Sequence, residues 1–444
     1  MMRSFADIFE VPELKKKILY TLAILAVYRL GAAIPLPGIN GEAMRMLFES
    51  QKNTLLGFLD IFSGGALGRF SIFSMGIMPY INSSIIMSLL QGAHVFPYLD
   101  HLAKEGELGR KKLNQITRYL TLFLGIVQSF GLIYSLTKLP TPGGLPIVTD
   151  PNAGFYLLSV LTLMTGTMVV MWMGEQITEN GIGNGISLII FTGIVIGLPK
   201  GLQDLVRLLS IEEISIFGAL LLGVVIFAFT VFTVYVQTGQ RKIQVQYAKR
   251  MVGRKVMGGA STFLPIKVDT SGVIAVIFAV SILSVPVTLA QFFPESGVAS
   301  KFMSLWNRGG WVYETLYAGL IIFFCYFYNS IQFNPTDLAE NMRKWGGFIP
   351  GIRPGESTAQ HIQKILERIT LWGALFVVII AILPDILRQK LNAPFFFGGT
   401  SLLIAVGVAL DTIGQIESHL IMRHYEGFLK KGRIKGRWFN VQSS

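Results

Sequence analysis

The sequence contains few charged residues and only one cysteine. Lys, Arg, Asp and Glu make up 14% of its 444 residues, whereas soluble domains carry roughly 25%. Cys325 has no second cysteine with which to form a disulfide, and the five histidines show no spacing typical of metal ligands. No G-x-S-x-G motif is present, and the Gly-rich run 181–185 lacks the spacing of a phosphate-binding loop. We therefore expect neither a soluble enzyme nor a catalytic, metal or cofactor site.

Long apolar stretches, separated by short clusters of charge, dominate the sequence. Hydrophobic residues make up 52% of the chain, and its mean hydropathy is +0.55. A helix needs about 20 predominantly apolar residues to cross a bilayer. The stretches that qualify as candidate spans are Lys17–Ala33, Phe73–Gly92, Thr117–Leu136, Gly154–Gly174, Gly183–Leu198, Ile214–Val236, Gly272–Phe292, Val312–Phe333, Ile369–Leu387 and Pro394–Ile413. The sequence therefore predicts an all-α, polytopic integral membrane protein with ten transmembrane helices.

The charges divide unequally between the two faces of the membrane when the N-terminus is placed inside. The inner segments then hold 27 Lys and Arg against 15 Asp and Glu, a net charge of +12, whereas the outer segments hold 10 of each kind. An excess of Lys and Arg is typical of cytoplasmic loops. We therefore predict that both termini and the two longest inner loops are cytoplasmic.

The inner loop 237–270 predicts a β-hairpin. Apolar and polar residues alternate on both sides of a Gly-containing tip, which is the pattern of paired strands. The apolar positions of this pattern are Ile243, Val245, Tyr247, Leu264, Ile266 and Val268, and the tip carries Lys249, Arg250, Arg254 and Lys255. A solvated loop that follows the charge rule is the alternative interpretation.

A second inner loop, 334–368, contains a stiff Gly/Pro run over 346–355 that holds Arg353. Two large basic loops on one face favour a bulky acidic partner, such as ribosomal RNA or an acidic patch on a motor protein. Attraction to the membrane surface is the alternative.

The outer segment Leu55–Ile72 is apolar but interrupted by Gly64, Gly65 and Gly68. It is too apolar for an outer linker and too short to cross the bilayer alone. Irregular backbone at membrane depth is tolerated only inside protein or along a water-filled cavity. The segment therefore predicts a half-helix folded back into a cavity open to the outside, with an interfacial helix on the outer surface as the alternative.

Ionisable residues are scarce inside the predicted spans. Arg29, Glu175 and Asp411 lie near span ends, and no two of them form a pair typical of a proton relay or an ion cage. Carriers and pumps usually contain such groups. The scarcity favours a passive channel over a secondary transporter of a small solute, and no site supports an intramembrane enzyme.

Several motifs, in order along the chain, resemble the SecY family, whose members are channel subunits of the bacterial Sec protein translocon. They are I-P-L-P-G at 34–38, F-S-G-G-A-L at 62–67, G-I-M-P-Y-I at 76–81, G-E-Q-I-T at 174–178, G-I-G-N-G-I-S at 181–187, I-P-G-I-R-P-G at 349–355 and F-G-G-T-S-L-L at 397–403. The resemblance runs from the first span to the basic tail. It implies a channel that moves unfolded secretory polypeptides across the cytoplasmic membrane and releases membrane-protein segments sideways into it.

The resemblance also implies a division of the chain that no internal repeat in the sequence reveals. It predicts ten helices in two pseudo-symmetric, inverted halves of five, 1–200 and 214–416, joined by an outer hinge over 201–213. The basic cytoplasmic tail would be 417–444, and a re-entrant plug helix would lie within about 55–72 of the first half.

The pore residues implied by the resemblance form an apolar ring and a plug. The ring consists of Ile77, Ile81, Ile190, Ile277 and Ile404, and the plug of Asp60, Ile61, Phe62, Ser63, Gly64, Gly65, Ala66, Leu67, Gly68 and Arg69. A narrow apolar constriction resists wetting and so blocks ions. The plug would fill the outer funnel of the idle channel.

The resemblance implies two further sites and a set of partners. We suggest Ser88, Gln128 and Ser281 as polar contacts of a lateral gate between the second and third spans on one side and the seventh and eighth on the other. A surface for docking the ribosome and a motor would comprise Arg241, Lys242, Lys249, Arg250, Arg254, Lys255 and Arg353. The expected partners are the small membrane subunits SecE and SecG, the SecA motor ATPase, ribosomal RNA and proteins, signal sequences, unfolded preproteins and membrane lipids.

Overall fold

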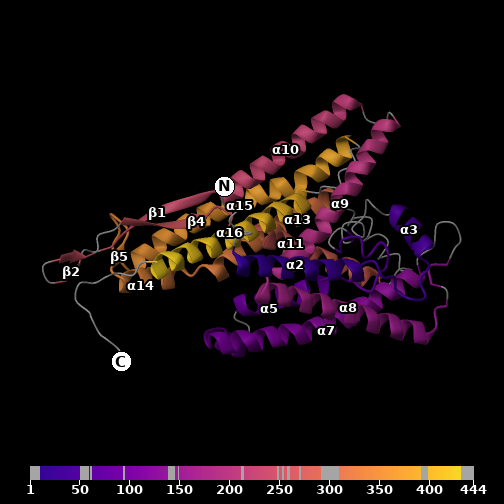
Figure 1. Cartoon of the computed structure of the whole chain (residues 1–444), viewed down its shortest axis with the longest axis horizontal. Helices are drawn as coiled ribbons and strands as arrows, with labels where there is room; N and C mark the ends of the chain where they lie inside the picture. Colours follow the sequence, from indigo (N-terminus) through magenta and orange to yellow (C-terminus); the bar gives the residue numbers. More distant parts are fainter. Residues whose placement is uncertain are drawn as a thin grey trace.

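The computed structural model describes residues 11–50, 60, 63–93, 96–138, 146–148, 150–211, 215–247, 250–252, 255–257, 261–269, 272–291, 310–391 and 399–431. Helices dominate these residues, and most run roughly along the long axis of the molecule (Figure 1). A small group of strands extends beyond one end of the helices. The predicted all-α class is therefore confirmed for the body of the molecule.

Each of the ten predicted spans falls on a helix. These helices are α2 (Pro12–Gly31), α5 (Met78–Gly92), α7 (Glu107–Lys138), α8 (Ala153–Asn180), α9 (Gly185–Ser210), α10 (Ile216–Thr238), α11 (Gly272–Gln291), α13 (Trp311–Gln332), α15 (Glu356–Leu391) and α16 (Gly399–Lys431). Among the described residues, seven helical stretches are long and apolar enough to cross a membrane by length and composition. Helix α11 is apolar over a shorter stretch, Gly272–Pro286. Two helices remain. Helix α2 carries charges in its first turns, and helix α5 is only 15 residues long.

Helix α5 begins five residues later than the predicted span Phe73–Gly92. Gly76 has a φ of +53°, which is incompatible with a right-handed helix, and Pro79 occupies the first turn, where its missing N–H is harmless. Three other helices are longer than a membrane requires: α7, α15 and α16 contain 32, 36 and 33 residues. At a rise of about 1.5 Å per residue, each is roughly 50 Å long, so their charged ends project beyond the bilayer.

The main core unites helices from both ends of the sequence. One buried apolar cluster contains residues of α2, α5, α8, α9, α11, α13, α15 and α16. A second cluster packs the short helix α3 (Gly41–Ser50) against α7, α8 and the chain around Leu36 and Phe70. Helix α10 contributes little to either cluster, and its large apolar side chains are exposed in the isolated chain, as expected for a face that meets lipid.

The predicted hairpin in the loop 237–270 is confirmed. Strand β1 (Gln240–Tyr247) pairs antiparallel with β4 (Ser261–Lys267), with Ile243 opposite Leu264. Two short strands, β2 (Arg250–Val252) and β3 (Lys255–Met257), pair near the tip.

A strand that we did not predict joins the two inner loops. Strand β5 (Gly347–Phe348) pairs with the other edge of β1, so that the sheet order is β4-β1-β5. Apolar residues of the sheet, of α14 (Pro335–Lys344) and of the start of α15 form a small core of their own. The two loops therefore fold together as one unit on the predicted cytoplasmic side, which we call the cytoplasmic unit. A further short helix, α6 (Pro97–Lys104), packs its apolar face on α5 and α7.

The described part of the predicted plug segment, 63–72, consists of consecutive turns. Gly64 and Gly65 have φ values of +67° and +79°, and Phe70 also has a positive φ, of +46°. Such backbone conformations interrupt a right-handed helix, and glycine adopts them without steric penalty. Ile61 and Phe62 lie outside the described residues, and Asp60 is helical.

Candidate functional site

The five isoleucines of the predicted ring all lie in the main buried cluster. Ile77 precedes α5 as its N-cap residue, and Ile81 follows within the first turn of that helix. Ile190, Ile277 and Ile404 lie on α9, α11 and α16, respectively. Each of the five is at most 8% exposed. Four regions of the chain, more than 300 positions apart at their extremes, thus bring the same β-branched side chain into one apolar cluster.

A tight turn positions Ile190 by starting α9 at a defined point. The Asn184 side chain caps the helix by accepting from the N–H groups of Ile186 and Ser187. A Cβ on Gly185 would lie 1.9 Å from the Gly174 carbonyl oxygen, so only glycine permits this approach of α8 and α9. The run 181–185 therefore forms the turn that starts α9.

Hydrogen bonds accepted by Asp60 hold the turns of the plug segment together. Its Oδ1 accepts from the Gly68 N–H at 2.6 Å and from Ser63 Oγ at 3.4 Å. Its backbone carbonyl accepts from the Gly65 N–H at 2.8 Å. Ala66 is completely buried in the main cluster, whereas Arg69 is exposed.

The plug segment is also tied to the chain that follows the first span. The Leu36 N–H donates to the Phe70 carbonyl at 2.9 Å, and the Ile72 N–H donates to the Ile34 carbonyl at 3.0 Å. Pro35 and Ser71 form an isolated antiparallel bridge between these two contacts. The I-P-L-P-G run, whose role the sequence left open, is therefore a strand-like support for the segment.

The plug segment lies one helical turn from the ring. A Cβ on Gly64 would lie only 2.9 Å from the Cα of Gly193, so these two backbones are in direct contact. Gly193 is three residues after Ile190, on the same face of α9. Because α9 begins at the inner surface in the predicted orientation, Gly193 is on the outer side of Ile190.

The three residues suggested for the lateral gate lie on helices that touch one another. Helix α11, which carries Ser281, packs against both α5, which carries Ser88, and α7, which carries Gln128. The Ser281 hydroxyl is buried and has no hydrogen-bond partner in the described part of the chain. Ser88 and Gln128 are half-buried. The role of these three residues stays a prediction.

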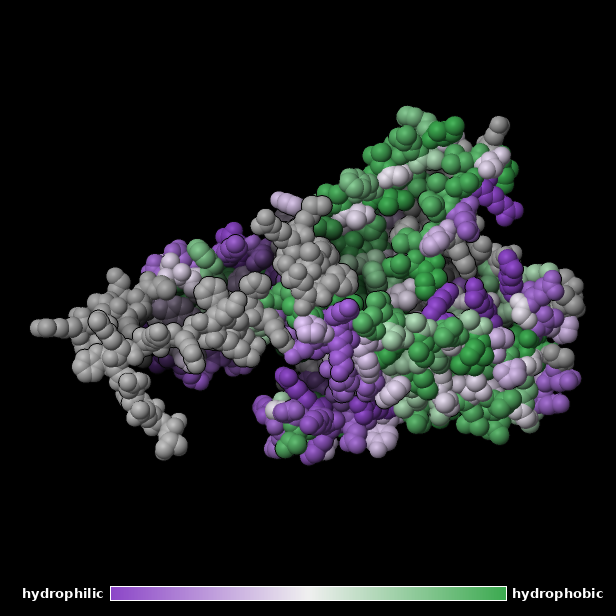
Figure 2. Space-filling view, in the orientation of Figure 1, coloured by the Kyte–Doolittle hydropathy of each residue, from purple (hydrophilic) through white to green (hydrophobic). Residues whose placement is uncertain are grey.

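The described basic residues among those predicted for docking lie on the cytoplasmic unit. Arg241 and Lys242 are exposed on β1, and Arg353 is exposed in the turn after β5. Arg250 and Lys255 lie on β2 and β3, while Lys249 and Arg254 lie outside the described residues. Figure 2 shows the contrast: hydrophilic residues collect around the sheet and the start of α7, and a broad hydrophobic face covers α10.

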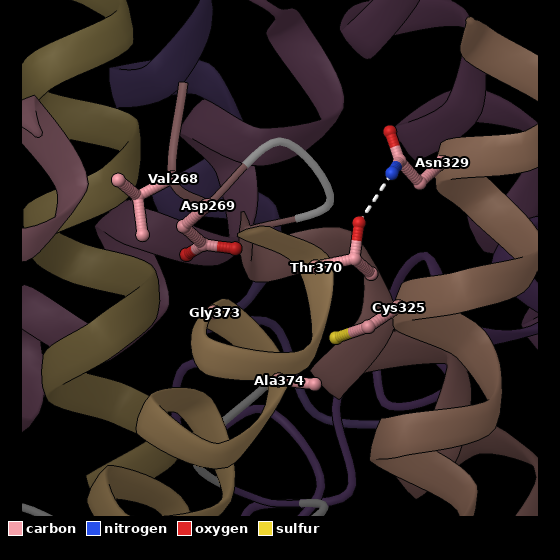
Figure 3. A pocket seen from close by; sticks show the side chains of 7 residues that line it. All are labelled: Val268, Asp269, Cys325, Asn329, Thr370, Gly373 and Ala374. Carbon is pink, nitrogen blue, oxygen red and sulfur yellow. Dashed lines mark hydrogen bonds between the residues drawn. The ribbon is translucent and has the colours of Figure 1, made fainter. Parts of the chain in front are cut away.

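A buried carboxylate, not singled out from the sequence, lies where the sheet meets α11. Asp269 Oδ1 accepts from the Gly272 N–H at 2.7 Å, and Oδ2 is buried without a hydrogen-bond partner in the described structure. Burial raises the pKa of Asp269 to about 6, against the opposing effects of the Gly272 N–H and Lys267. Figure 3 shows the carboxylate beside a small pocket, with Thr370 on its far side hydrogen-bonded to Asn329. The Asp269 side chain thus accepts from the first N–H of α11, the helix that carries Ser281 of the predicted lateral gate.

Two ion pairs between distant parts of the chain were also absent from the sequence interpretation. Arg118 on α7 binds Glu175 on α8, and Lys267 on β4 lies 3.9 Å from Asp411 on α16. No spacing rule relates residues so far apart in sequence. Among the described residues, no group of three or more His, Cys, Asp or Glu side chains could hold a metal ion.

Comparison with known proteins places this arrangement in a family. The SecY family model matches residues 71–413. The protein translocase subunit SecY of Escherichia coli K12 is 47% identical over 428 residues, which cover 96% of each chain. The SecY subunit of Thermotoga maritima is 43% identical over 455 residues, covering 98% of this chain and all of the relative. These relatives give no support to the alternative of a small-solute transporter.

Solved structures share the fold at much lower sequence identity. A structure described as a protein conducting channel matches with a TM-score of 0.64 and 17% identity over 95% of both chains. Sec61 in a canine ribosome–channel complex from the endoplasmic reticulum matches with a TM-score of 0.59 and 15% identity, again over 95% of both. The chain is thus a multi-pass membrane protein, and it belongs to the SecY family.

Proposed function

We propose that this chain is the channel-forming subunit of a protein translocase in the bacterial cytoplasmic membrane, with both termini in the cytoplasm. The observation that carries the proposal is the meeting of Ile77, Ile81, Ile190, Ile277 and Ile404 in one buried cluster contributed by four regions of the chain. The relatives named above are translocase subunits, and their similarity covers nearly the whole chain.

The isoleucine ring is the constriction through which an unfolded polypeptide passes. A narrow apolar passage resists wetting, so it blocks ions when no chain occupies it. Because isoleucine is β-branched, its χ1 torsion is restricted, and the ring keeps a defined shape. Its side chain makes no hydrogen bonds, so it can close around any passing sequence without selecting for one.

The plug segment and the gate helices control this passage. The segment around Ser63–Phe70 fills the outer side of the ring in the idle channel, in contact with α9 at Gly193. An apolar signal sequence leaves sideways between α5 and α7 on one side and α11 and α13 on the other. Ser88, Gln128 and Ser281 lie along that path and set how readily it opens.

The cytoplasmic unit is the docking surface for the machines that drive transport. Its exposed basic residues, among them Arg241, Lys242 and Arg353, suit the phosphates of ribosomal RNA and acidic surfaces of a motor ATPase. SecE and SecG would complete the assembly in the membrane, where the exposed apolar faces of this chain are available to them and to lipid.

A cross-linking experiment tests the conducting role. Cys325 is replaced by Ser, Ile190 by Cys, and a secretory chain with one cysteine is stalled during export. A cross-link that requires a functional signal sequence is expected, because the translocating chain passes the ring. A matched control carries Cys at Leu220, which is 64% exposed on α10 and far from the cluster. Export without a cross-link at 190, or with equal cross-linking at 220, would contradict the proposal.

A further inference from the structure

An arginine in the first span points at the plug segment. Arg29 lies in the last turn of α2 and is half-buried. Its Nη1 donates to the carbonyl oxygen of Gly64 at 2.6 Å. The preceding residue, Tyr28, is buried and donates from its hydroxyl to the Ser63 carbonyl at 3.2 Å. Two consecutive residues of α2 therefore hold two consecutive carbonyl groups of the plug segment.

The backbone at Gly64 can be held there only because the residue is glycine. Its φ of +67° lies in the left-handed region, and Gly193 of α9 leaves no room for a Cβ. Since α2 also packs against α9, Gly64 is confined between the arginine of one helix and the backbone of the other. The packing of α2 and α9 around Gly64 thus holds its carbonyl group beside Arg29.

The charge of Arg29 has a further counterpart within the plug segment. The Asp60 carboxylate interacts electrostatically with the Arg29 guanidinium, while its Oδ1 holds the Gly68 N–H. Arg69 is exposed and repels Arg29. The plug segment therefore offers Arg29 a carbonyl acceptor and an opposite charge at Asp60, together with a stronger like charge at Arg69.

A cation inside a membrane protein is unfavourable unless it is paired or meets water. With the plug segment in place, the hydrogen bond to the Gly64 carbonyl meets this need, and Asp60 offsets part of the repulsion from Arg69. When the segment leaves, the funnel fills with water, which solvates the guanidinium instead. Arg29 is therefore satisfied in both states, and the contact can hold the segment without trapping it.

We infer that Arg29 is the positioning residue that anchors the plug segment, and that breaking its bond to the Gly64 carbonyl is a step in opening. This inference rests on the proposed function, in which the plug segment seals the idle channel. It concerns a residue of the first span rather than the plug segment itself.

The test measures exposure of the plug segment without any transport. Ala66, which is fully buried, is replaced by Cys in a Cys325→Ser background, and a membrane-impermeant maleimide is added from the outer side. We expect Arg29→Gln to raise the labelling rate about tenfold or more, because a hydrogen bond to a charged group is lost. Arg45→Gln, at an exposed position of α3 and also on the predicted outer side, is the matched control and should leave the rate unchanged. Equal rates with Gln and Arg at position 29 would overturn the inference.

A second variant and a second readout keep the outcomes separate. Arg29→Lys keeps the charge but loses the guanidinium geometry, so its labelling rate should lie between those of Arg and Gln. If the Arg29→Gln protein does not accumulate, the Arg29→Lys variant is used in its place. A labelling rate in the Lys variant equal to that of the parent with Arg29 would then overturn the inference. Ion conductance of the idle channel should rise in parallel with labelling. Failure of the Ile190 cross-link would contradict the proposed function but leave the labelling result, and so the anchor, intact.

Discussion

Arg118 of α7 and Glu175 of α8 form a two-pronged ion pair, with Nε to Oε1 at 2.9 Å and Nη2 to Oε2 at 2.8 Å. The residues are 57 positions apart: Arg118 lies eleven residues after the start of α7, and Glu175 lies five residues before the end of α8. The pair fixes α7, one flank of the proposed lateral gate, to a helix that does not line the gate.

Breaking this pair should make the channel less selective for signal sequences. The side chains are 44% and 21% exposed, so solvent screening limits the pair to about 1 kcal/mol despite its favourable geometry. We expect Glu175→Gln to increase export of a preprotein whose signal sequence has a shortened apolar core. The double variant Arg118→Glu with Glu175→Arg should restore stringency. Unchanged export of the defective preprotein by the Gln variant would refute this role.

Asp269 should make stability depend on pH in an unusual direction. Burial raises its pKa in the folded protein from 3.8 to about 6, so between these values the native state binds a proton that the unfolded state does not. Stability therefore rises as pH falls through 6, by about 1.4 kcal/mol between pH 7 and 5 and by about 3 kcal/mol over the whole titration. The charged groups that act on the carboxylate are Lys267 and Asp411. Thermal unfolding in detergent at several pH values measures the effect.

The matched variant for this prediction is Asp269→Asn. The amide oxygen can still accept from the Gly272 N–H, so the start of α11 is retained, while the ionisation is removed. The variant should be more stable than the parent at pH 7.5 and should lose the pH-dependent increment below pH 6. An identical pH profile in parent and variant would show that another group titrates.

Two glycines of α9 should respond in opposite ways to alanine. A Cβ at Gly185 would meet the Gly174 carbonyl oxygen at 1.9 Å, whereas no described atom outside the backbone of α9 itself lies within 4 Å of a Cβ at Gly197. We expect Gly185→Ala to cost about 3 kcal/mol or more, because backbone must move. Gly197→Ala should be neutral or stabilising by up to about 1 kcal/mol, since alanine is the better helix former. Accumulation and thermal stability of the two variants distinguish them, and equal losses would count against the packing described.

Reversing the charge of Arg353 should impair motor-driven export. The side chain is exposed, and the turn that carries it is held by its own backbone, whose carbonyl accepts from Thr358 Oγ1 at 2.9 Å. Arg353→Glu therefore removes a docking charge without disturbing the fold. Preprotein export should fall, while expression and thermal stability remain normal. The matched control is Lys364→Glu, an exposed charge on α15. Normal export by the Arg353 variant would contradict its place in docking.

Hydropathy and period-2 alternation were sufficient to predict the long apolar helices and the hairpin. Both patterns report burial along a single element, which is why Ile243 and Leu264 could be assigned to facing strands. Strand β5 was missed because two residues, Gly347 and Phe348, are too few to carry a pattern. The start of α5 was misplaced because apolar residues continue through the turns before it.

The candidate site was less accessible to pattern analysis. Ile190 and Ile404 look like ordinary core residues, and only the family resemblance singled them out. Contacts such as Gly183 N–H to Gln415 Oε1, at 2.9 Å, join residues 232 positions apart. No local propensity encodes such pairs, because they exist only once the helices have packed.

The sheet that joins the two predicted cytoplasmic loops is connected to the membrane helices by very short links. Strand β1 starts two residues after α10 ends, and α11 starts five residues after β4 ends. On the other side, β5 ties the same sheet to α14 and the start of α15. The unit is therefore coupled mechanically to α10, α11 and α15. A force applied to the hairpin would therefore act on α10, α11 and α15 together.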